Sequence, residues 1–263
     1  MVLTITLIQS KLDWEDIEAN LDRFTDLINQ TDRSDLMILP EMFSTGFSMR
    51  SEQLAEGMDG RTVSWMREQA NRTDTTICGS VIIHEHNKFV NRFIWARPNG
   101  TIQHYDKKHL FRMSEENENY SPGQKRLIVK LKDFNICPQI CYDLRFPVFS
   151  RNVAQGPGEP DPPYDLLLYV ANWPSARRLH WRALLQARAI ENQCYVVGVN
   201  RIGVDGNKTV YQGDSCVLDP QGSYLADLAD DATSVTVSLD MPLLKAYREN
   251  FPAWKDSDRF DLK

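Results

Sequence analysis

The chain is organised around the stretch NICPQICYDLRFPVFSR, residues 135–151, which holds two of its five cysteines. The first part of this stretch is mostly apolar and predicts a buried strand that closes at Cys141. A tyrosine, an aspartate and an arginine follow within four positions. A thiol in this setting is open to three interpretations: a packed core thiol, a metal ligand or a nucleophile.

Similar strand-like runs, rich in β-branched and aromatic residues, recur along the whole chain. Between them, residues 13–30 place apolar side chains from Ile17 to Ile28 at spacings of three and four, which predicts a helix, and residues 178–193 show the same periodicity. Residues 91–108 predict a hairpin, because PNG is a turn signal. The order of these elements predicts an α/β fold with a mixed sheet covered by helices. The expected strands are VLTITLIQ, DLMILP, TTICGSVII, NRFIWARP, LIVKL, NICPQIC, DLLLYVAN, CYVVGVNRI, DSCVLDP and SVTVSLD.

Length and composition predict one folded domain over residues 1–263, since 42% of the residues are hydrophobic and 25% are charged. The Gly- and Pro-rich segment at 154–163 reads as an exposed loop within that domain. We expect a cytoplasmic protein with reduced thiols, because the N-terminus lacks signal-peptide features and no apolar run approaches the ~20 residues that span a bilayer. A net charge of -6 argues against nucleic acid or an anionic membrane as partner.

Three reactive or charged groups stand at the ends of expected strands: Glu41, Lys107 and Cys141. A thiol with an ordinary pKa of about 8.5 needs a base or a nearby cation to become a nucleophile. Glu41 could be that base. Lys107 could stabilise the oxyanion of a tetrahedral intermediate and donate a proton, with the N–H of Tyr142 as a second donor. These groups together predict acyl transfer through a thioester, with release of an amine.

Three short segments around these residues carry a family resemblance. LPEMF with Glu41, YDKKHLF with Lys107 and CYDLRFP with Cys141 resemble the signature segments of the carbon-nitrogen hydrolase (nitrilase) superfamily, in the same order. ENENYSPG resembles the segment with the family's second glutamate, which falls on Glu116. The segments that follow the nucleophile are similar as well, so the resemblance covers nearly the whole chain.

The resemblance implies a four-layer α-β-β-α sandwich, a homodimer, and catalysis by Cys141, Glu41, Lys107 and Glu116 without a metal or an organic cofactor. Within the family, the chain is similar to bacterial omega-amidases, which implies hydrolysis of the distal amide of 2-oxoglutaramate or 2-oxosuccinamate.

The same resemblance implies a set of residues around the substrate. Arg145 matches an arginine placed to contact the substrate carboxylate, a task that suits a bidentate guanidinium. The segment NWPSA departs from eukaryotic omega-amidases, which tend to carry Phe and Thr where this chain has Asn172 and Ala176. The expected substrate-binding residues are Arg145, Tyr142, Asn172 and Trp173.

Several alternatives remain open. A buried cysteine is more often structural, and a Cys-His dyad with His109 or His180 would be a rival mechanism. Glu116 lies in SEENEN, which by itself indicates a solvated acidic loop. A related amidase acting on N-carbamoyl or short aliphatic amides is the second functional hypothesis. A nitrilase-fold interaction module is the third, supported by the acidic, Pro-rich loop at 154–163.

Overall fold

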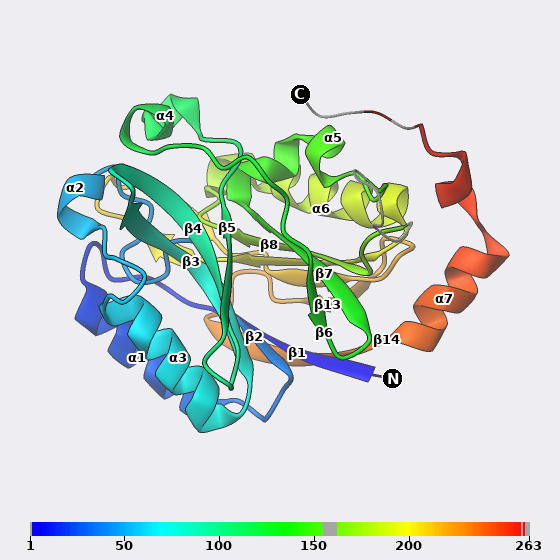
Figure 1. Cartoon of the computed structure of the whole chain (residues 1–263), viewed down its shortest axis with the longest axis horizontal. Coiled ribbons are helices and arrows are strands. Elements are labelled where there is room, and N and C mark those ends of the chain that lie inside the picture. The colour runs from blue at the N-terminus through cyan, green and yellow to red at the C-terminus, as the bar shows by residue number, and fades with distance from the viewer. Residues whose placement is uncertain (1, 155–161, 259, 261–263) are drawn as a thin grey trace.

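Two six-stranded sheets lie against each other in the computed structural model, which describes residues 2–154, 162–258 and 260 (Figure 1). The first sheet has the strand order β14-β1-β2-β3-β4-β5. Strands β1, β2 and β3 run parallel, and the remaining pairs are antiparallel. Its strands are β1 Val2–Gln9, β2 Leu36–Ile38, β3 Thr76–Glu85, β4 Lys88–Ala96, β5 Ile102–Asp106 and β14 Thr233–Asp240.

The second sheet has the order β13-β12-β9-β8-β7-β6, with β7, β8 and β9 parallel. A separate two-stranded hairpin, β10 with β11, follows β9. The strands are β6 Val129–Leu131, β7 Phe134–Ile140, β8 Leu166–Ala171, β9 Tyr195–Asn200, β10 Ile202–Val204, β11 Val210–Gln212, β12 Cys216–Leu218 and β13 Tyr224–Asp227.

Helices cover the outer face of each sheet, so the molecule has four layers (Figure 1). Helices α1 and α3 pack on the first sheet, and α6 packs on the second. The four-layer sandwich implied by the resemblance is therefore confirmed. The α-helices are α1 Ile17–Gln30, α2 Ser51–Leu54, α3 Arg61–Thr73, α4 Glu116–Asn119, α5 Pro147–Ser150, α6 Arg178–Asn192 and α7 Met241–Asn250; 3-10 helices cover Arg112–Ser114, Cys141–Arg145, Ser175–Arg177 and Ala253–Asp256.

The local signals of the sequence explain these elements. Helix α1 begins after Asp16, whose carboxylate accepts a hydrogen bond from the N–H of Ala19, and its buried Leu21 and Phe24 lie on the face that meets the sheet. The β4–β5 hairpin turns at Gly100, whose φ of +82° is a conformation that glycine adopts without strain. Both predicted elements are confirmed.

The main core lies between the two sheets and continues beneath α6. Leu3, Ile5 and Trp95 of the first sheet meet Ile136 and Leu168 of the second, and all five are fully buried. Each side chain of this size contributes about 1.5–3 kcal/mol when buried. This packing holds the two sheets at a fixed separation, so residues at their strand ends keep their relative positions.

Some expectations fall beyond what the structure tests. The predicted loop at 154–163 lies for the most part, at 155–161, outside the described residues. The single domain over 1–263 stays a prediction. Within the described ranges, none of the helices combines the length and apolar character needed to cross a lipid bilayer.

Candidate active site

The three residues singled out at strand ends come together in the structure. Glu41 follows β2, Lys107 follows β5, and Cys141 follows β7 at the start of a 3-10 helix. Nζ of Lys107 lies 2.8 Å from Oε1 of Glu41. Lys107 and Cys141 line the same cavity. The ends of three strands from two sheets therefore present one cluster of side chains.

Lys107 lies between two buried carboxylates. Its Nζ donates to Oε1 of Glu41 at 2.8 Å and to both oxygens of Glu116 at 2.9 and 3.0 Å. Burial acts to lower the pKa of Lys107, but the carboxylates of Glu116 and Glu41 outweigh it and raise this pKa above its ordinary value. Lys107 therefore carries a fixed positive charge. Burial raises the pKa of Glu116, and Lys107 offsets that effect only in part.

Two asparagines hold the carboxylates, and sequence reasoning assigned neither of them this role. Nδ2 of Asn91 donates to Glu41 at 2.8 Å and to Glu116 at 3.4 Å. The main-chain N–H of Asn172 donates to Oε2 of Glu41 at 2.8 Å, and its Nδ2 donates to the carbonyl oxygen of Glu41 at 2.6 Å. The signal for Asn91 was an asparagine within an apolar strand, because a buried amide needs a polar partner.

Cys141 has an unusual backbone conformation and a thiol whose pKa is raised. Its φ is +45°, in the left-handed region that costs a non-glycine residue about 1–2 kcal/mol. Burial, together with the negative charge of Glu41, raises the pKa of the Cys141 thiol well above its ordinary value, although Lys107 acts in the opposite direction. The raised pKa favours the thiol over the thiolate, so a base that removes its proton would assist attack.

The turn that carries Cys141 is anchored by a buried aspartate. Asp143 accepts hydrogen bonds from the N–H of Ile140 at 3.0 Å and from the hydroxyl of Tyr105 at 2.7 Å. It also lies 2.8 Å from Nδ1 of His109. These bonds supply the external support that a residue with positive φ requires.

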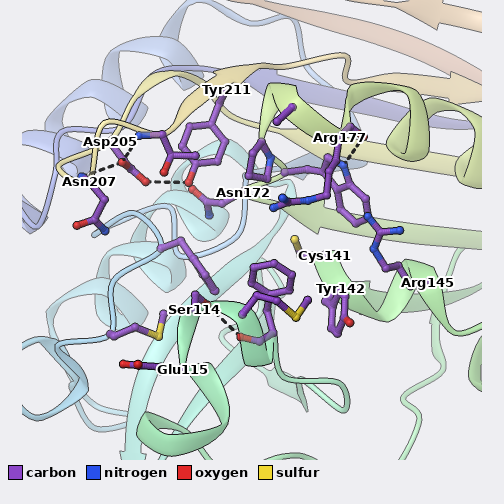
Figure 2. Close-up of a pocket in the computed structure, with 18 of the residues that line it drawn as sticks. Ser114, Glu115, Cys141, Tyr142, Arg145, Asn172, Arg177, Asp205, Asn207 and Tyr211 are labelled. Atoms are coloured by element: carbon purple, nitrogen blue, oxygen red, sulfur yellow. Dashed lines mark hydrogen bonds between the residues drawn. The ribbon is translucent and has the colours of Figure 1, made fainter.

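A cavity of about 540 Å³ opens over Cys141 (Figure 2). The four predicted substrate-binding residues, Arg145, Tyr142, Asn172 and Trp173, all line it. The guanidinium of Arg145 lies over the Trp173 ring, 4.8 Å from the centroid. Glu116 does not line the cavity and lies behind Lys107, fully buried. The cavity also contains Arg177, a residue that sequence reasoning did not select.

The two histidines of the rival dyad lie elsewhere. His109 stacks on Phe146 with ring centroids 3.9 Å apart and pairs with Asp143. His180 lies on the surface with Nδ1 3.0 Å from Nη2 of Arg145. Neither histidine lines the cavity over Cys141. Within the described residues, His, Cys, Asp and Glu side chains form no group able to hold a metal ion.

Comparison with known proteins places this arrangement in a family. Residues 4–249 match the carbon-nitrogen hydrolase family model. The chain is 47% identical over 261 residues to omega-amidase YafV of Escherichia coli strain K12, covering 99% of this chain and 98% of the relative. It is 30% identical to a 2-oxoglutaramate amidase of Bacillus subtilis, covering 97% and 98%.

A solved structure agrees with these relatives. A CN-hydrolase superfamily protein from Xanthomonas campestris, with an arsenic adduct in its active site, superposes with a TM-score of 0.96 at 46% identity and covers both chains fully. The whole described fold, with the strand ends that carry Glu41, Lys107 and Cys141, is thus common to the two proteins. The chain belongs to the carbon-nitrogen hydrolase family.

Proposed function

We propose that this protein is an omega-amidase that hydrolyses the distal amide of 2-oxo dicarboxylic acid monoamides, such as 2-oxoglutaramate and 2-oxosuccinamate. The observation that carries the proposal is the buried Glu41–Lys107–Glu116 cluster beside the Cys141 thiol, in a chain 47% identical to an omega-amidase over 99% of its length. The products are the 2-oxo dicarboxylate and ammonia.

The first half of the reaction forms a thioester. Glu41 takes the proton from the Cys141 thiol as Sγ attacks the amide carbon, which gives a tetrahedral intermediate. The ammonium of Lys107 and the N–H of Tyr142 stabilise its oxyanion. The raised pKa of Lys107 makes it a fixed charge rather than a proton donor, so the protonated Glu41 supplies the proton to the leaving ammonia.

The second half hydrolyses the thioester. Glu41, again a carboxylate, takes a proton from water as the water oxygen attacks the thioester carbon. The intermediate collapses, the C–S bond breaks, and the proton returns to Cys141 as the acid product leaves. Glu116 positions Lys107 throughout, because both of its oxygens accept hydrogen bonds from Nζ.

Two residues of the cavity have the chemistry to bind the two ends of the substrate, its amide and its carboxylate. Asn172 lines the cavity, and its buried Oδ1 has no hydrogen-bond partner among the described residues, so it is an acceptor for the N–H groups of the amide. Arg145 binds the carboxylate at the other end of the substrate, and Trp173 holds the guanidinium in place through cation–π contact.

The decisive experiment is ammonia release from 2-oxoglutaramate by the wild type, by Cys141→Ser and by Cys194→Ser as a matched control. We expect loss of turnover only in Cys141→Ser, since Cys194 is a buried core thiol. Glutamine, asparagine, a simple nitrile and N-carbamoyl-β-alanine complete the panel. If the wild type turns over another amide of the panel and not 2-oxoglutaramate, the proposed substrate is wrong and the proposed mechanism stands. If the wild type turns over none of the compounds in the panel, the interaction-module hypothesis is favoured.

The oligomeric state and the location complete the proposal. We infer a homodimer in the cytoplasm that pairs through the surface around α5 and α6, where Val148 and Leu179 are exposed with 53% and 75% of their area accessible. Burial of such apolar side chains favours association. Light scattering of the wild type and of Leu179→Glu tests the dimer, which the charged variant should dissociate.

A further inference from the structure

Arg177, the arginine that sequence reasoning did not select, has side-chain donors without a protein partner among the residues that the structure describes. It ends the 3-10 helix Ser175–Arg177 and lines the cavity that contains Cys141. Its guanidinium lies over the ring of Phe111, 5.2 Å from the centroid. Among the described residues, the Arg177 side chain has no carboxylate partner. Because a cation–π contact uses none of the N–H groups of a guanidinium as hydrogen-bond donors to a polar atom, the donors of Arg177 remain available to a ligand.

Arg145 repeats this arrangement in the same cavity, and Figure 2 shows it on the same side as Arg177. Its guanidinium lies over Trp173, and its Nη2 lies 3.0 Å from Nδ1 of His180. In the part of the chain that the structure covers, it too lacks a carboxylate partner. Partial burial, and after it the positive charge of Arg177, lowers the pKa of Arg145. Two like charges thus share one cavity, which costs free energy in the empty protein.

Among the described residues, the acidic side chains that line the cavity form no ion pair with either arginine. Asp205 lines the cavity, but its oxygens accept hydrogen bonds from the hydroxyl of Tyr211 and from the N–H groups of Asn207 and Thr209. Glu115 also lines the cavity, and it is exposed to solvent. Positive charge therefore remains at the arginine side of the cavity for an anionic ligand.

The neighbouring arginine on the same segment behaves differently. Arg178 donates to both oxygens of Asp214 at 2.6 and 2.8 Å and does not line the cavity. Arg182 also pairs with Asp214. The fold thus supplies a carboxylate to Arg178 and Arg182 and, within the described residues, leaves Arg145 and Arg177 without one. Arg178 is the matched control for Arg177.

We propose that Arg177 is a specificity-determining residue that acts with Arg145 to bind the carboxylate and the adjacent 2-oxo group of the substrate and to exclude a 2-ammonium group. This inference rests on the proposed function. A guanidinium binds a carboxylate through two parallel N–H groups, and a second one has donors for the neighbouring oxygen. Two positive charges repel an ammonium at the same carbon. The pair therefore selects an oxo acid amide over glutamine, which has the same chain length.

The first test measures kcat and KM for 2-oxoglutaramate, glutamine and uncharged butyramide with wild type, Arg177→Gln, Arg177→Lys and Arg178→Gln. We expect Arg177→Gln to lower kcat/KM for 2-oxoglutaramate about 10- to 100-fold, mainly through KM, because charge-assisted hydrogen bonds are lost. Butyramide turnover should change by less than about twofold, since it has no charge to bind. Arg177→Lys should recover part of the loss, and Arg178→Gln should match the wild type.

The second test requires no turnover. Of the five cysteines, all in the described part of the chain, Cys141 is the one with measurable exposure, at 8%, so alkylation in the folded protein reports on it. The ratio of its labelling rates with iodoacetate and iodoacetamide measures attraction for an anion and cancels the thiolate fraction. We expect Arg177→Gln to lower this ratio at least threefold at low salt, and Arg178→Gln to leave it unchanged.

The two tests separate the inference from the proposed function. If the wild type does not turn over 2-oxoglutaramate, the proposed substrate is wrong. The ratio of the Cys141 labelling rates with iodoacetate and iodoacetamide then decides the role of Arg177 by itself. If the wild type turns it over and Arg177→Gln keeps its kcat/KM within twofold, the inference is overturned. An unchanged labelling ratio in Arg177→Gln overturns it in either case.

Discussion

The main-chain N–H of Asn172 donates a 2.8 Å hydrogen bond to Oε2 of Glu41 and thereby joins the second sheet to the proposed general base on the first. The side chain of Asn172 adds a 2.6 Å bond from Nδ2 to the carbonyl oxygen of Glu41. Glu41 is therefore held from both sheets, since Asn91 and Lys107 of the first sheet bind Oε1.

Asn172→Ala tests this link. The substitution keeps the main-chain bond to Glu41 but removes the bond from Nδ2 and the acceptor Oδ1 in the cavity. We expect kcat for 2-oxoglutaramate to fall about tenfold or more, because a misplaced base loses alignment, and unfolding free energy to fall by about 1–2 kcal/mol. Asn207→Ala, on an exposed residue of the same cavity, is the control in both assays. Equal kinetics in the two variants would rule out the positioning role.

Lys107→Met should make stability depend on pH. The variant leaves two buried carboxyls without their cation, which costs about 3–5 kcal/mol when both are charged. Burial already raises the pKa of Glu116, and loss of Lys107 raises it further. Protons bound in the folded state then favour folding at low pH, and this contribution is lost as pH rises through the raised pKa.

Urea unfolding at about pH 5.5 and about pH 8 measures this effect, and the difference from wild type should be larger at the higher pH. The adjacent Lys108→Met is the control, because Lys108 is only half-buried and no carboxylate pair depends on it in the described structure. A loss of stability in Lys107→Met that is the same at both pH values would contradict the argument.

Glu41→Gln should lower the pKa of Cys141. Burial and then the negative charge of Glu41 raise the pKa of Cys141, while the positive charge of Lys107 acts to lower it. Removing the charge of Glu41 leaves Lys107 as the dominant nearby charge, so the thiolate becomes more stable. The ultraviolet absorbance of thiolate, taken as a difference from the matching Cys141→Ala protein, reports the titration.

We expect little thiolate at Cys141 between about pH 6 and about pH 9 in the wild type, and a titration at clearly lower pH in Glu41→Gln. The variant should still lose turnover, because it has no base for the later proton transfers. A wild-type thiolate already complete at neutral pH would show that Cys141 is activated as a preformed ion pair.

Cys141→Gly should be more stable than Cys141→Ala. The φ of +45° at position 141 strains any residue with a Cβ, whereas glycine adopts this conformation without strain. We therefore expect the unfolding free energy of Cys141→Gly to exceed that of Cys141→Ala by about 1 kcal/mol. Cys216 on β12 is the control, since its φ is not positive and glycine there should be less stable than alanine by about 0.5–1 kcal/mol. The same order at both positions would remove the evidence for strain.

Strands and strand ends could be predicted from the sequence because they depend on local patterns. The runs that became β1, β7 and β8 are apolar and bounded by turns or polar residues, and Lys107 rather than Lys108 proved to be buried, as alternation and the family motif indicated. The pairing of two sheets came from the resemblance, since periodicity alone predicted one mixed sheet.

The remaining site residues depend on contacts that no local pattern encodes. Glu116 lies in an acidic run and is fully buried, because Lys107 and the N–H of Phe111 bind its oxygens. Arg177 and Arg178 are adjacent in the sequence and look equivalent, and the cavity alone distinguishes them. The role of Asn91 follows from its hydrogen bond to Glu41, and the sequence alone does not show that the two residues are neighbours.

The pairing of the first strand with the last one has a consequence for biosynthesis. Strand β1 is the neighbour of β14, and their register runs from Val2 opposite Asp240 to Gln9 opposite Thr233. While the chain is made from its N-terminus, β1 has an unpaired edge that invites association with other nascent chains until β14 leaves the ribosome. Ribosomes stalled shortly before residue 233 should therefore hold an aggregation-prone chain without amidase activity, although Glu41, Lys107 and Cys141 have all been synthesised.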